Sequence, residues 1–277
     1  MIRIVTDSSS DIPPHLLEAH SIEVVPLTIR FESQEFVDGL DLTTADFWHR
    51  LVAAEALPET AAPSTGLFGE RYQTIADSGA DGIVVITISS ELSGTYQSAV
   101  IAAEQFDSPL PIKVIDSASV GMGLGLPVLA AAERAAAGAS LEEVAATATR
   151  AAASTTVIAA LDTLEYLKRG GRIGSAQAFF GSLLNIKPIV TLENGVVTPF
   201  GRVRTRSKAL AALEDRVAAL GPRIRSVAVF HGAAPDAARF SSSLQEHLTS
   251  EVITTLLGAV VGTHTGPGTI GIAYSTD

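Results

Sequence analysis

Runs of apolar residues alternate with amphipathic runs through the first half of the chain. Residues 82–88 (GIVVITI) and 112–115 (IKVI) are apolar on both faces, which is typical of parallel strands covered by helices. We therefore expect a mostly parallel sheet with helices on both faces. The expected strands are Arg3–Thr6, Glu23–Phe31, Gly82–Ile88 and Lys113–Asp116, and the expected helices are Pro13–His20, Thr44–Ala54, Gly66–Asp77, Thr95–Gln105 and Gly123–Ala137. Residues 57–64 (LPETAAPS) are expected to form a loop.

The second half of the chain has a different pattern. An expected helix at Leu141–Ala152 leads into it, and Asn194-Gly195 between two apolar runs indicates a hairpin with a type I′ turn. A hairpin favours a mixed or antiparallel sheet. The expected strands are Thr156–Leu161, Ile186–Glu193, Val196–Arg204, Arg225–His231, Val252–Leu257 and Thr269–Tyr274, and the expected helices are Thr163–Lys168, Lys208–Leu220 and Pro235–His247.

Composition limits the class of protein. The chain has 277 residues, of which 47% are hydrophobic and 18% charged, so it is globular and long enough for two α/β domains, expected at residues 1–150 and 151–277. A net charge of −11 argues against general nucleic-acid binding. The chain has no cysteine, which excludes disulfides and thiolate metal sites. It shows neither a signal peptide nor an apolar run near the roughly 20 residues of a membrane span, so we expect a cytoplasmic protein.

Three of the expected parallel strands are followed by hydroxyl-bearing residues and then by a helix. These junctions are residues 6–10 (TDSSS), 89–95 (SSELSGT) and 116–119 (DSAS). The carboxyl ends of parallel strands lie along one edge of the sheet, where open α/β sheets bind ligands. Three such junctions favour a site that binds its ligand through oxygen atoms. Asp7 and Asp116 are equally well interpreted as turn or cap residues.

The junction that carries Ser93, Gly94 and Thr95 precedes an expected helix directly. Free backbone N–H groups and the positive end of the helix dipole favour an anion there. A helix N-cap accounts for a lone serine or threonine just as well.

Catalytic interpretations have less support. A nucleophilic Ser93 would need a base, and among the six histidines only His264 is expected on a loop, among glycines and threonines. No G-x-S-x-G surrounds Ser93, so a serine hydrolase or a phosphotransferase is the alternative rather than the preferred function. Residues 266–271 (GPGTIG) match G-x-G-x-x-G but open no helix. No catalytic residue and no metal ligand is assigned.

Arg172 follows the glycines of residues 167–173 (LKRGGRI). A helix C-cap explains Gly170 and Gly171 but not Arg172. Residues 173–184, rich in apolar and small side chains, are expected to be core or to line an apolar slot.

Ten motifs in order resemble one family. They are TDSSSDIP, PLTI, DG at residues 38–39, TAAPSTGLF, ISSELSGTYQSA, VIDSASVGMGLG, LKRGGRIG, LNIKPI, GRVRTRSKAL and GTHTGPGTIG. The chain resembles the DegV family, the fatty-acid-binding subunits of bacterial fatty acid kinase. The family's TSQPS reads TAAPS from Thr60, and its SMG reads GMG from Gly121, which leaves the shape of the pocket and the preferred acyl chain open.

The resemblance implies two α/β domains with a long-chain fatty acid between them and no further cofactor. It implies that Thr60 and Ser93 hold the carboxylate, with Gly94 and Thr95 beside them, and that His264 and Arg172 belong to the head-group site. It also implies that the protein is not itself the kinase. A separate ATP-binding kinase subunit would phosphorylate the acid, a downstream acyltransferase would take the acyl phosphate, and peripheral contact with a membrane would fit such a carrier.

Overall fold

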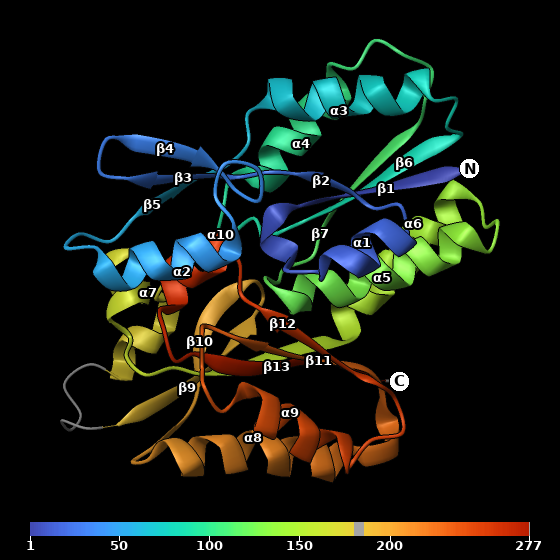
Figure 1. Cartoon of the computed structure of the whole chain (residues 1–277). Coiled ribbons are helices and arrows are strands. Elements are labelled where there is room, and N and C mark those ends of the chain that lie inside the picture. Colours follow the sequence, from blue (N-terminus) through green and yellow to red (C-terminus); the bar gives the residue numbers. More distant parts are fainter. Residues whose placement is uncertain (180–185, 277) are drawn as a thin grey trace.

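The computed structural model describes residues 1–179 and 186–276, and within these ranges the strands form three sheets. The first is a parallel sheet in the order β2-β1-β6-β7, made of β1 (Ile2–Asp7), β2 (Glu23–Val25), β6 (Gly82–Thr87) and β7 (Ile112–Asp116). Helices α3 (Thr65–Asp77) and α4 (Thr95–Glu104) cover one face, and α5 (Met122–Ala136) and α6 (Leu141–Ser154) cover the other (Figure 1). The expected parallel sheet with helices on both faces is confirmed.

The second half forms a mixed sheet in the order β10-β9-β8-β13-β11-β12. Its strands are β8 (Thr155–Ala160), β9 (Lys187–Glu193), β10 (Val196–Val203), β11 (Ile224–His231), β12 (Val252–Leu256) and β13 (Ile270–Thr276). Neighbouring strands are antiparallel except for β11 and β12, which are parallel. Helices α8 (Arg206–Leu220) and α9 (Ala237–Gln245) cover the outer face, and η3 (Gly221–Arg223) follows α8.

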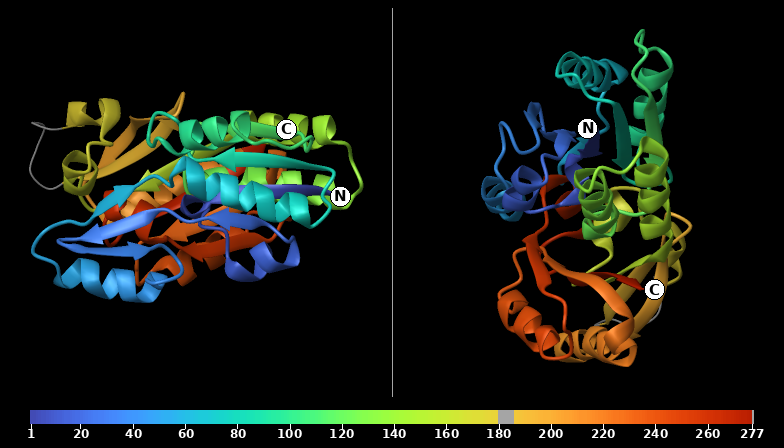
Figure 2. Two further views of the ribbon diagram at one scale, coloured as in Figure 1. Left: turned by 90° about the horizontal axis from the view of Figure 1, so that it is seen from above. Right: turned by 90° about the vertical axis from the view of Figure 1, so that its right-hand side faces the viewer.

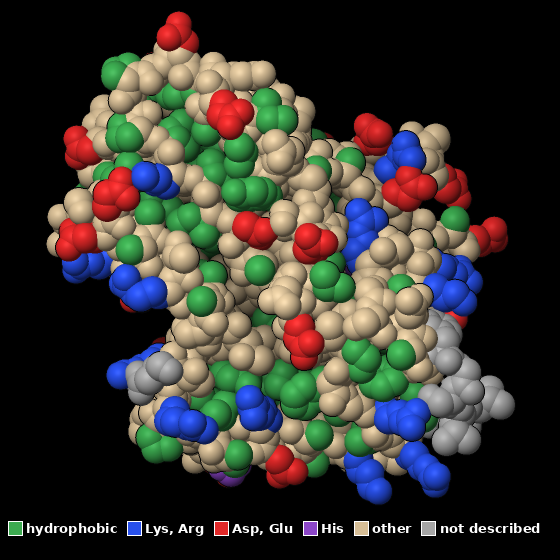
Figure 3. Space-filling model, turned by 180° about the vertical axis from the view of Figure 1, so that it is seen from behind, with side chains coloured by type: hydrophobic (Ala, Val, Ile, Leu, Met, Phe, Trp, Pro, Cys, Tyr) green, Lys and Arg blue, Asp and Glu red, His purple; other side chains and the backbone are tan. Residues whose placement is uncertain are grey.

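Helix α5 lies between the two large sheets. Its buried side chains pack against the parallel sheet and also against β8, β11 and β13 of the mixed sheet. The right-hand view of Figure 2 shows this central layer, with the first half of the chain above it and the second half below. The back of the molecule narrows at a waist between the two halves (Figure 3). The sequence prediction of an α/β protein with two sheet-based units is therefore correct.

A small antiparallel sheet extends the first half in the order β4-β3-β5. It contains β3 (Thr28–Phe31), β4 (Gln34–Val37) and β5 (Glu59–Ala61), and α2 (Thr44–Ala53) packs beside it. The prediction of one strand over residues 23–31 is wrong, because Pro26 has no N–H to continue a ladder and the chain moves to another sheet there. The prediction of a loop at residues 57–64 is also wrong, since it contains β5.

Helix α10 (Ala259–Thr265) belongs to the second half of the chain but packs among elements of the first half. Its neighbours include α2, β3, β5 and the 3-10 helix η1 (Ser8–Ser10), as well as α7 (Glu165–Arg169). The prediction that His264 lies on a loop is wrong, because His264 is in the last turn of α10. Helix α1 (Pro14–Ala19) and the 3-10 helix η2 (Gly174–Phe179) complete the described elements.

The predicted hairpin between β9 and β10 is confirmed. Asn194 and Gly195 have φ angles of +50° and +80°, as a type I′ turn requires. The hydroxyl of Ser89, after β6, donates a 2.9 Å hydrogen bond to the carbonyl of Gly195. The hairpin tip is therefore attached to the carboxyl edge of the parallel sheet. Within residues 1–179 and 186–276, no helix combines the length and apolar character needed to cross a bilayer.

Candidate functional site

A cavity lies between the carboxyl edge of the parallel sheet and the inner face of the mixed sheet. Its enclosed volume is about 150 Å³. Most of its wall is apolar, with contributions from both halves of the chain. The apolar wall consists of Leu27, Ala62, Ile88, Leu92, Val120, Val157, Ala159, Leu161, Leu167, Val190, Leu192, Val197, Phe230, Leu257, Val260 and Val261.

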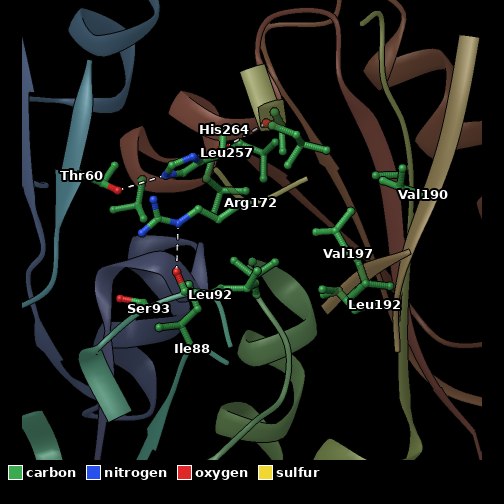
Figure 4. A pocket seen from close by; sticks show the side chains of 18 of the residues that line it. Thr60, Ile88, Leu92, Ser93, Arg172, Val190, Leu192, Val197, Leu257 and His264 are labelled. Atoms are coloured by element: carbon green, nitrogen blue, oxygen red, sulfur yellow. Dashed lines mark hydrogen bonds between the residues drawn. The ribbon is translucent and has the colours of Figure 1, made fainter. Parts of the chain in front are cut away.

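The polar side chains gather at one end of this cavity. Figure 4 shows Thr60, Ser93, Arg172 and His264 grouped together, and Val190, Leu192 and Val197 at the opposite end. Thr191 also lines the wall, but its hydroxyl donates a 2.6 Å hydrogen bond to the carbonyl of Val157. The cavity therefore offers one polar end and a long apolar remainder.

Thr60 and His264 meet across 204 residues of sequence. Thr60 lies in β5, whose pairing with β3 places it opposite Ile29, and His264 lies at the end of α10. The Oγ1 atom of Thr60 and the Nε2 atom of His264 are 3.0 Å apart. No local sequence pattern places Thr60 near His264, so their contact results from the tertiary fold.

The imidazole of His264 is neutral near pH 7. Burial, and secondarily the nearby Arg172 guanidinium, lowers its pKa to about 4. Its Nδ1 atom is buried and has no hydrogen-bond partner among the described residues. A proton on Nδ1 would leave a buried donor unsatisfied, so the arrangement favours the tautomer in which Nε2–H donates to Thr60. The Thr60 hydroxyl proton is then free to point into the cavity as a donor.

Arg172 lies at the same end of the cavity. Its Nε donates to the carbonyl of Leu92 at 3.1 Å and its Nη1 to the carbonyl of Gly170 at 2.7 Å. These bonds hold the half-buried guanidinium beside the polar group of side chains (Figure 4). A cation in this place favours a ligand with a negative charge.

The helix-cap interpretation of the two glycines before Arg172 is confirmed, because Gly170 is the C-cap of α7 and Gly171 follows it. Gly171 has a φ of +71°, and Arg172 N–H donates to the carbonyl of Leu167, so helix α7 ends in a Schellman motif. Gly170 has an ordinary right-handed conformation. A Cβ atom on Gly170 would lie 2.1 Å from Nδ1 of His264, so at Gly170 it is the imidazole ring that requires glycine.

Ser93 and Gly94 line the cavity at the start of α4. The N-cap of α4 is Gly94, which has no side chain to cap the helix, and Ser93 accepts only a long 3.4 Å hydrogen bond from Thr95 N–H. Simple helix capping therefore does not explain Ser93. Thr95 is buried and does not line the cavity, but its hydroxyl is 2.8 Å from that of Ser93. Thr95 thus supports Ser93 from behind.

The other two hydroxyl-rich junctions do not present hydroxyl groups to the cavity. Asp7 accepts hydrogen bonds from Ser9 N–H at 3.0 Å and from Ile88 N–H at 2.7 Å. Asp116 accepts from Ala118 N–H at 2.8 Å and from the N–H of Ser90. The interpretation of Asp7 and Asp116 as turn and cap residues is the one that the structure supports. Their junctions do lie along one edge of the sheet, as expected, because β1, β6 and β7 are adjacent and parallel.

The glycine-rich run at residues 266–271 is explained by packing. A Cβ on Gly266 would lie 2.3 Å from the ring of Tyr166, and one on Gly268 would lie 2.6 Å from Asp162. Gly266 also ends α10 with a φ of +75°. The described residues contain no group of three or more His, Asp or Glu side chains able to hold a metal ion.

Sequence reasoning missed the apolar end of the cavity, which β9 and β10 build. Residues 173–184 were expected to be core or to line a slot, and residues 180–184 of this segment lie outside the described residues. In the described part, Ala176 is buried, Ile173 and Phe179 pack against the core, and none of residues 173–179 lines the cavity. The sequence signal for the apolar end was the alternation of side chains between the two faces of the hairpin. Val190, Leu192 and Val197 share the face turned to the cavity.

Thr60, Arg172 and His264 also line a second hollow, whose other walls include Pro58 and the exposed residues Glu59 and Arg169. The polar end of the cavity therefore lies next to the surface of the protein. A ligand with its charged group at this end would have that group within reach of a second protein.

Comparison with known proteins agrees with this architecture. The family pattern described as "Uncharacterised protein, DegV family" matches residues 1–277. A DegV domain-containing protein of Streptomyces coelicolor is 42% identical over 279 residues, covering 99% of this chain and 98% of that protein.

Two solved structures share the fold. One, described as "Fatty Acid Binding of a DegV family Protein from Thermus thermophilus", has a TM-score of 0.91 at 36% identity and covers 100% of this chain and 99% of that one. The other is a stearic-acid-binding protein of Eubacterium ventriosum, with a TM-score of 0.91 at 26% identity over 100% and 98% of the two chains. With the sequence match and the fold in agreement, the chain belongs to the DegV family.

Proposed function

We propose that this protein binds one long-chain fatty acid in the cavity between its two large sheets and presents the carboxylate to a separate kinase subunit. The observation that carries the proposal is the polarity of the cavity, which has hydrogen-bonding groups at one end and an apolar wall along the rest. A fatty acid has the same division. The fatty-acid-binding relatives with the same fold support this choice of ligand.

The polar end suits a carboxylate. Thr60 and Ser93 each offer a hydroxyl donor, Gly94 lies at the N-terminus of α4, and Arg172 supplies a positive charge nearby. Hydrogen bonds to a charged group contribute roughly 1.5–3 kcal/mol each. The neutral His264 orients Thr60 so that its hydroxyl proton points to the ligand.

The apolar wall would supply most of the affinity. Each buried methylene contributes roughly 0.8 kcal/mol, so a C16 tail gains on the order of 11 kcal/mol before ordering and association costs are subtracted. The head-group contacts then mainly determine which end of the ligand faces the surface. This division of roles fits a carrier, because the tail is held while the carboxylate remains available for chemistry.

Transfer of a phosphoryl group to this carboxylate would come from a partner. Phosphoryl transfer relies on groups that position the phosphates and on bridging metal ions, and the glycine-rich run of this chain is explained by packing instead. We therefore propose that an ATP-binding kinase subunit docks at the hollow beside Thr60, Arg172 and His264. An acyltransferase would then consume the acyl phosphate.

Native mass spectrometry tests the ligand. Protein purified from bacteria should carry the mass of a C16 or C18 fatty acid, and stripped protein should regain it from added palmitate. The kinase step is tested by incubating the loaded protein with ATP and Mg²⁺, with and without a compatible kinase subunit. Acyl phosphate formed without the subunit would contradict the carrier role, and failure to bind any fatty acid would overturn the proposed function.

A further inference from the structure

Two buried carboxyl groups of the first half meet the start of helix α10. Asp11 accepts a 2.8 Å hydrogen bond from the backbone N–H of Gly258, the N-cap of α10. The carboxyl group of Asp38 lies beside the N–H of Ala259, the first helical residue. Two consecutive N–H groups at the beginning of the helix therefore face carboxyl groups from a different part of the fold.

The chain that leads into α10 is held in the same way. The hydroxyl of Thr255 donates to the backbone carbonyl of Asp11 at 2.9 Å. The indole Nε1–H of Trp48, in α2, donates to the carbonyl of Leu257 at 2.9 Å. Residues 255–258 of the second half are thus hydrogen-bonded to the first half at three points.

These contacts determine the position of His264. His264 is five residues beyond Ala259. In an α-helix this separation is a rise of about 7.5 Å, which is less than two full turns. Gly262, between them, lies so close to α2 that a Cβ there would be 2.5 Å from Phe47 and 2.9 Å from Trp48. A helix this short and this closely packed moves as one body, so a shift at its first residue is transmitted to its last turn.

Burying two carboxyl groups in this place costs folding free energy. Asp11 and Asp38 are both buried, and Oδ2 of Asp11 has no partner among the described residues. Burial raises the pKa of Asp38 to about 6, with Asp7 adding to the effect. Burial also raises the pKa of Asp11 well above its usual range, with Asp38 and Asp7 adding to the effect. An exposed cap would avoid this cost, so the location of the two groups has a reason other than the stability of one short helix.

We propose that Asp11 and Asp38 are positioning residues of the head-group site: by binding the first turn of α10 across the boundary between the two halves, they hold the His264 ring against Thr60. The inference rests on the proposed function for its effect on ligand binding, although the position of the ring itself does not depend on any ligand.

The test compares Asp38→Ala with Asp38→Asn, which keeps an acceptor oxygen. Asp41→Ala is the matched control, because Asp41 is exposed, lies in the same loop and accepts its hydrogen bond from Val37 N–H instead. In lipid-stripped protein, nitrogen NMR of the histidine rings measures the pKa of His264. Asp38→Ala should move that pKa from about 4 toward the ordinary 6.5, whereas Asp38→Asn and Asp41→Ala should leave it unchanged.

The second readout is the ratio of affinities for palmitate and for hexadecanol, which share a tail but differ in head group. Asp38→Ala should lower this ratio about tenfold, as the loss of about 1.4 kcal/mol at the head group would. A merely destabilised fold would weaken both ligands equally. Asp38→Asn should preserve the ratio.

An unchanged His264 pKa and an unchanged ratio in Asp38→Ala would overturn the proposal, and so would a folded Asp38→Asn that behaves like Asp38→Ala. If Asp38→Ala does not fold, Thr255→Val removes one of the three hydrogen bonds with little change in side-chain volume and should shift the same readouts in the same direction. A wild-type protein that does not prefer palmitate to hexadecanol would contradict the proposed function, while the NMR comparison would still decide the positioning role.

Discussion

Replacing Gly170 by alanine tests the head-group site with a single methyl group. Gly170 has φ −74° and ψ −6°, a conformation open to any residue, so alanine introduces no backbone strain. The added Cβ would lie 2.1 Å from Nδ1 and 2.8 Å from Cε1 of His264, and 3.1 Å from the carbonyl of Tyr166. The imidazole is therefore the group that must yield.

The size of the effect follows from these distances. An ordinary contact begins near 3.4 Å, so the ring must retreat by more than 1 Å. A displacement of this size would distort the 3.0 Å contact between Thr60 and His264. With Thr60 no longer oriented, we expect the loss of one hydrogen bond to the charged head group, about 1.5–3 kcal/mol, which lowers palmitate affinity by about 10- to 150-fold.

Titration calorimetry with palmitate on stripped protein measures this loss. Gly171→Ala is the control, because a Cβ there has open space around it but the φ of +71° is unfavourable for alanine. It should cost about 1–2 kcal/mol of stability and leave palmitate affinity unchanged. If Gly170→Ala binds palmitate within twofold of the wild type, the role assigned to the His264 ring is refuted.

The remaining predictions concern the same region. Thr60→Val and Ser93→Ala should each weaken palmitate binding by roughly 1.5–3 kcal/mol with little change in melting temperature. Equilibrium dialysis with labelled palmitate measures this loss, and undiminished palmitate retention in both variants would show that the two hydroxyls do not bind the ligand. Arg172→Ala should reduce phosphoryl transfer by the kinase subunit more than it reduces fatty-acid retention, because the acyl phosphate carries more charge; equal losses would indicate a folding defect. The pKa of Asp38 is raised from 3.8 to about 6 in the folded protein. Between these two pH values, the native state therefore binds more protons than the unfolded state does. The stability of the wild type relative to Asp38→Asn should then be greatest below about pH 4 and fall by roughly 2–3 kcal/mol as the pH rises through 6. Urea unfolding of both proteins from pH 4 to 7.5 measures this difference, and a difference that rises with pH would contradict the assignment.

The parts of the fold that local patterns describe well were predictable from the sequence. The apolar run at residues 82–88 predicts a strand buried on both faces, and β6 is buried along its whole length. Asn194-Gly195 predicts a type I′ hairpin because few other residue pairs accept two positive φ angles. In both cases the residues themselves contain the information, since the interaction is local or depends only on burial.

Helix α10 was not predictable in this way. Its sequence, AVVGTHT, contains β-branched residues and a glycine, all poor helix formers, and it is too short to be stable alone. It forms because the first half supplies hydrogen-bond partners for its first turn, Asp11 among them. The same limit applies to the contact of Thr60 with His264: the family resemblance suggested both residues, whereas no local pattern indicates that a short edge strand and this helix would meet.

The separation of Thr60 and His264 along the chain also has a consequence for biosynthesis. At roughly 5–20 residues per second of translation, the 204 residues between them take about 10–40 s to be made. During that time Thr60 and Ser93 have left the ribosome, but the helix that completes the head-group site does not yet exist. A nascent chain would therefore expose the apolar edge of its first sheet before it could bind both the head group and the tail of a fatty acid there. Under the proposed function, a fatty acid could be held at both its head group and its tail only after translation has passed His264.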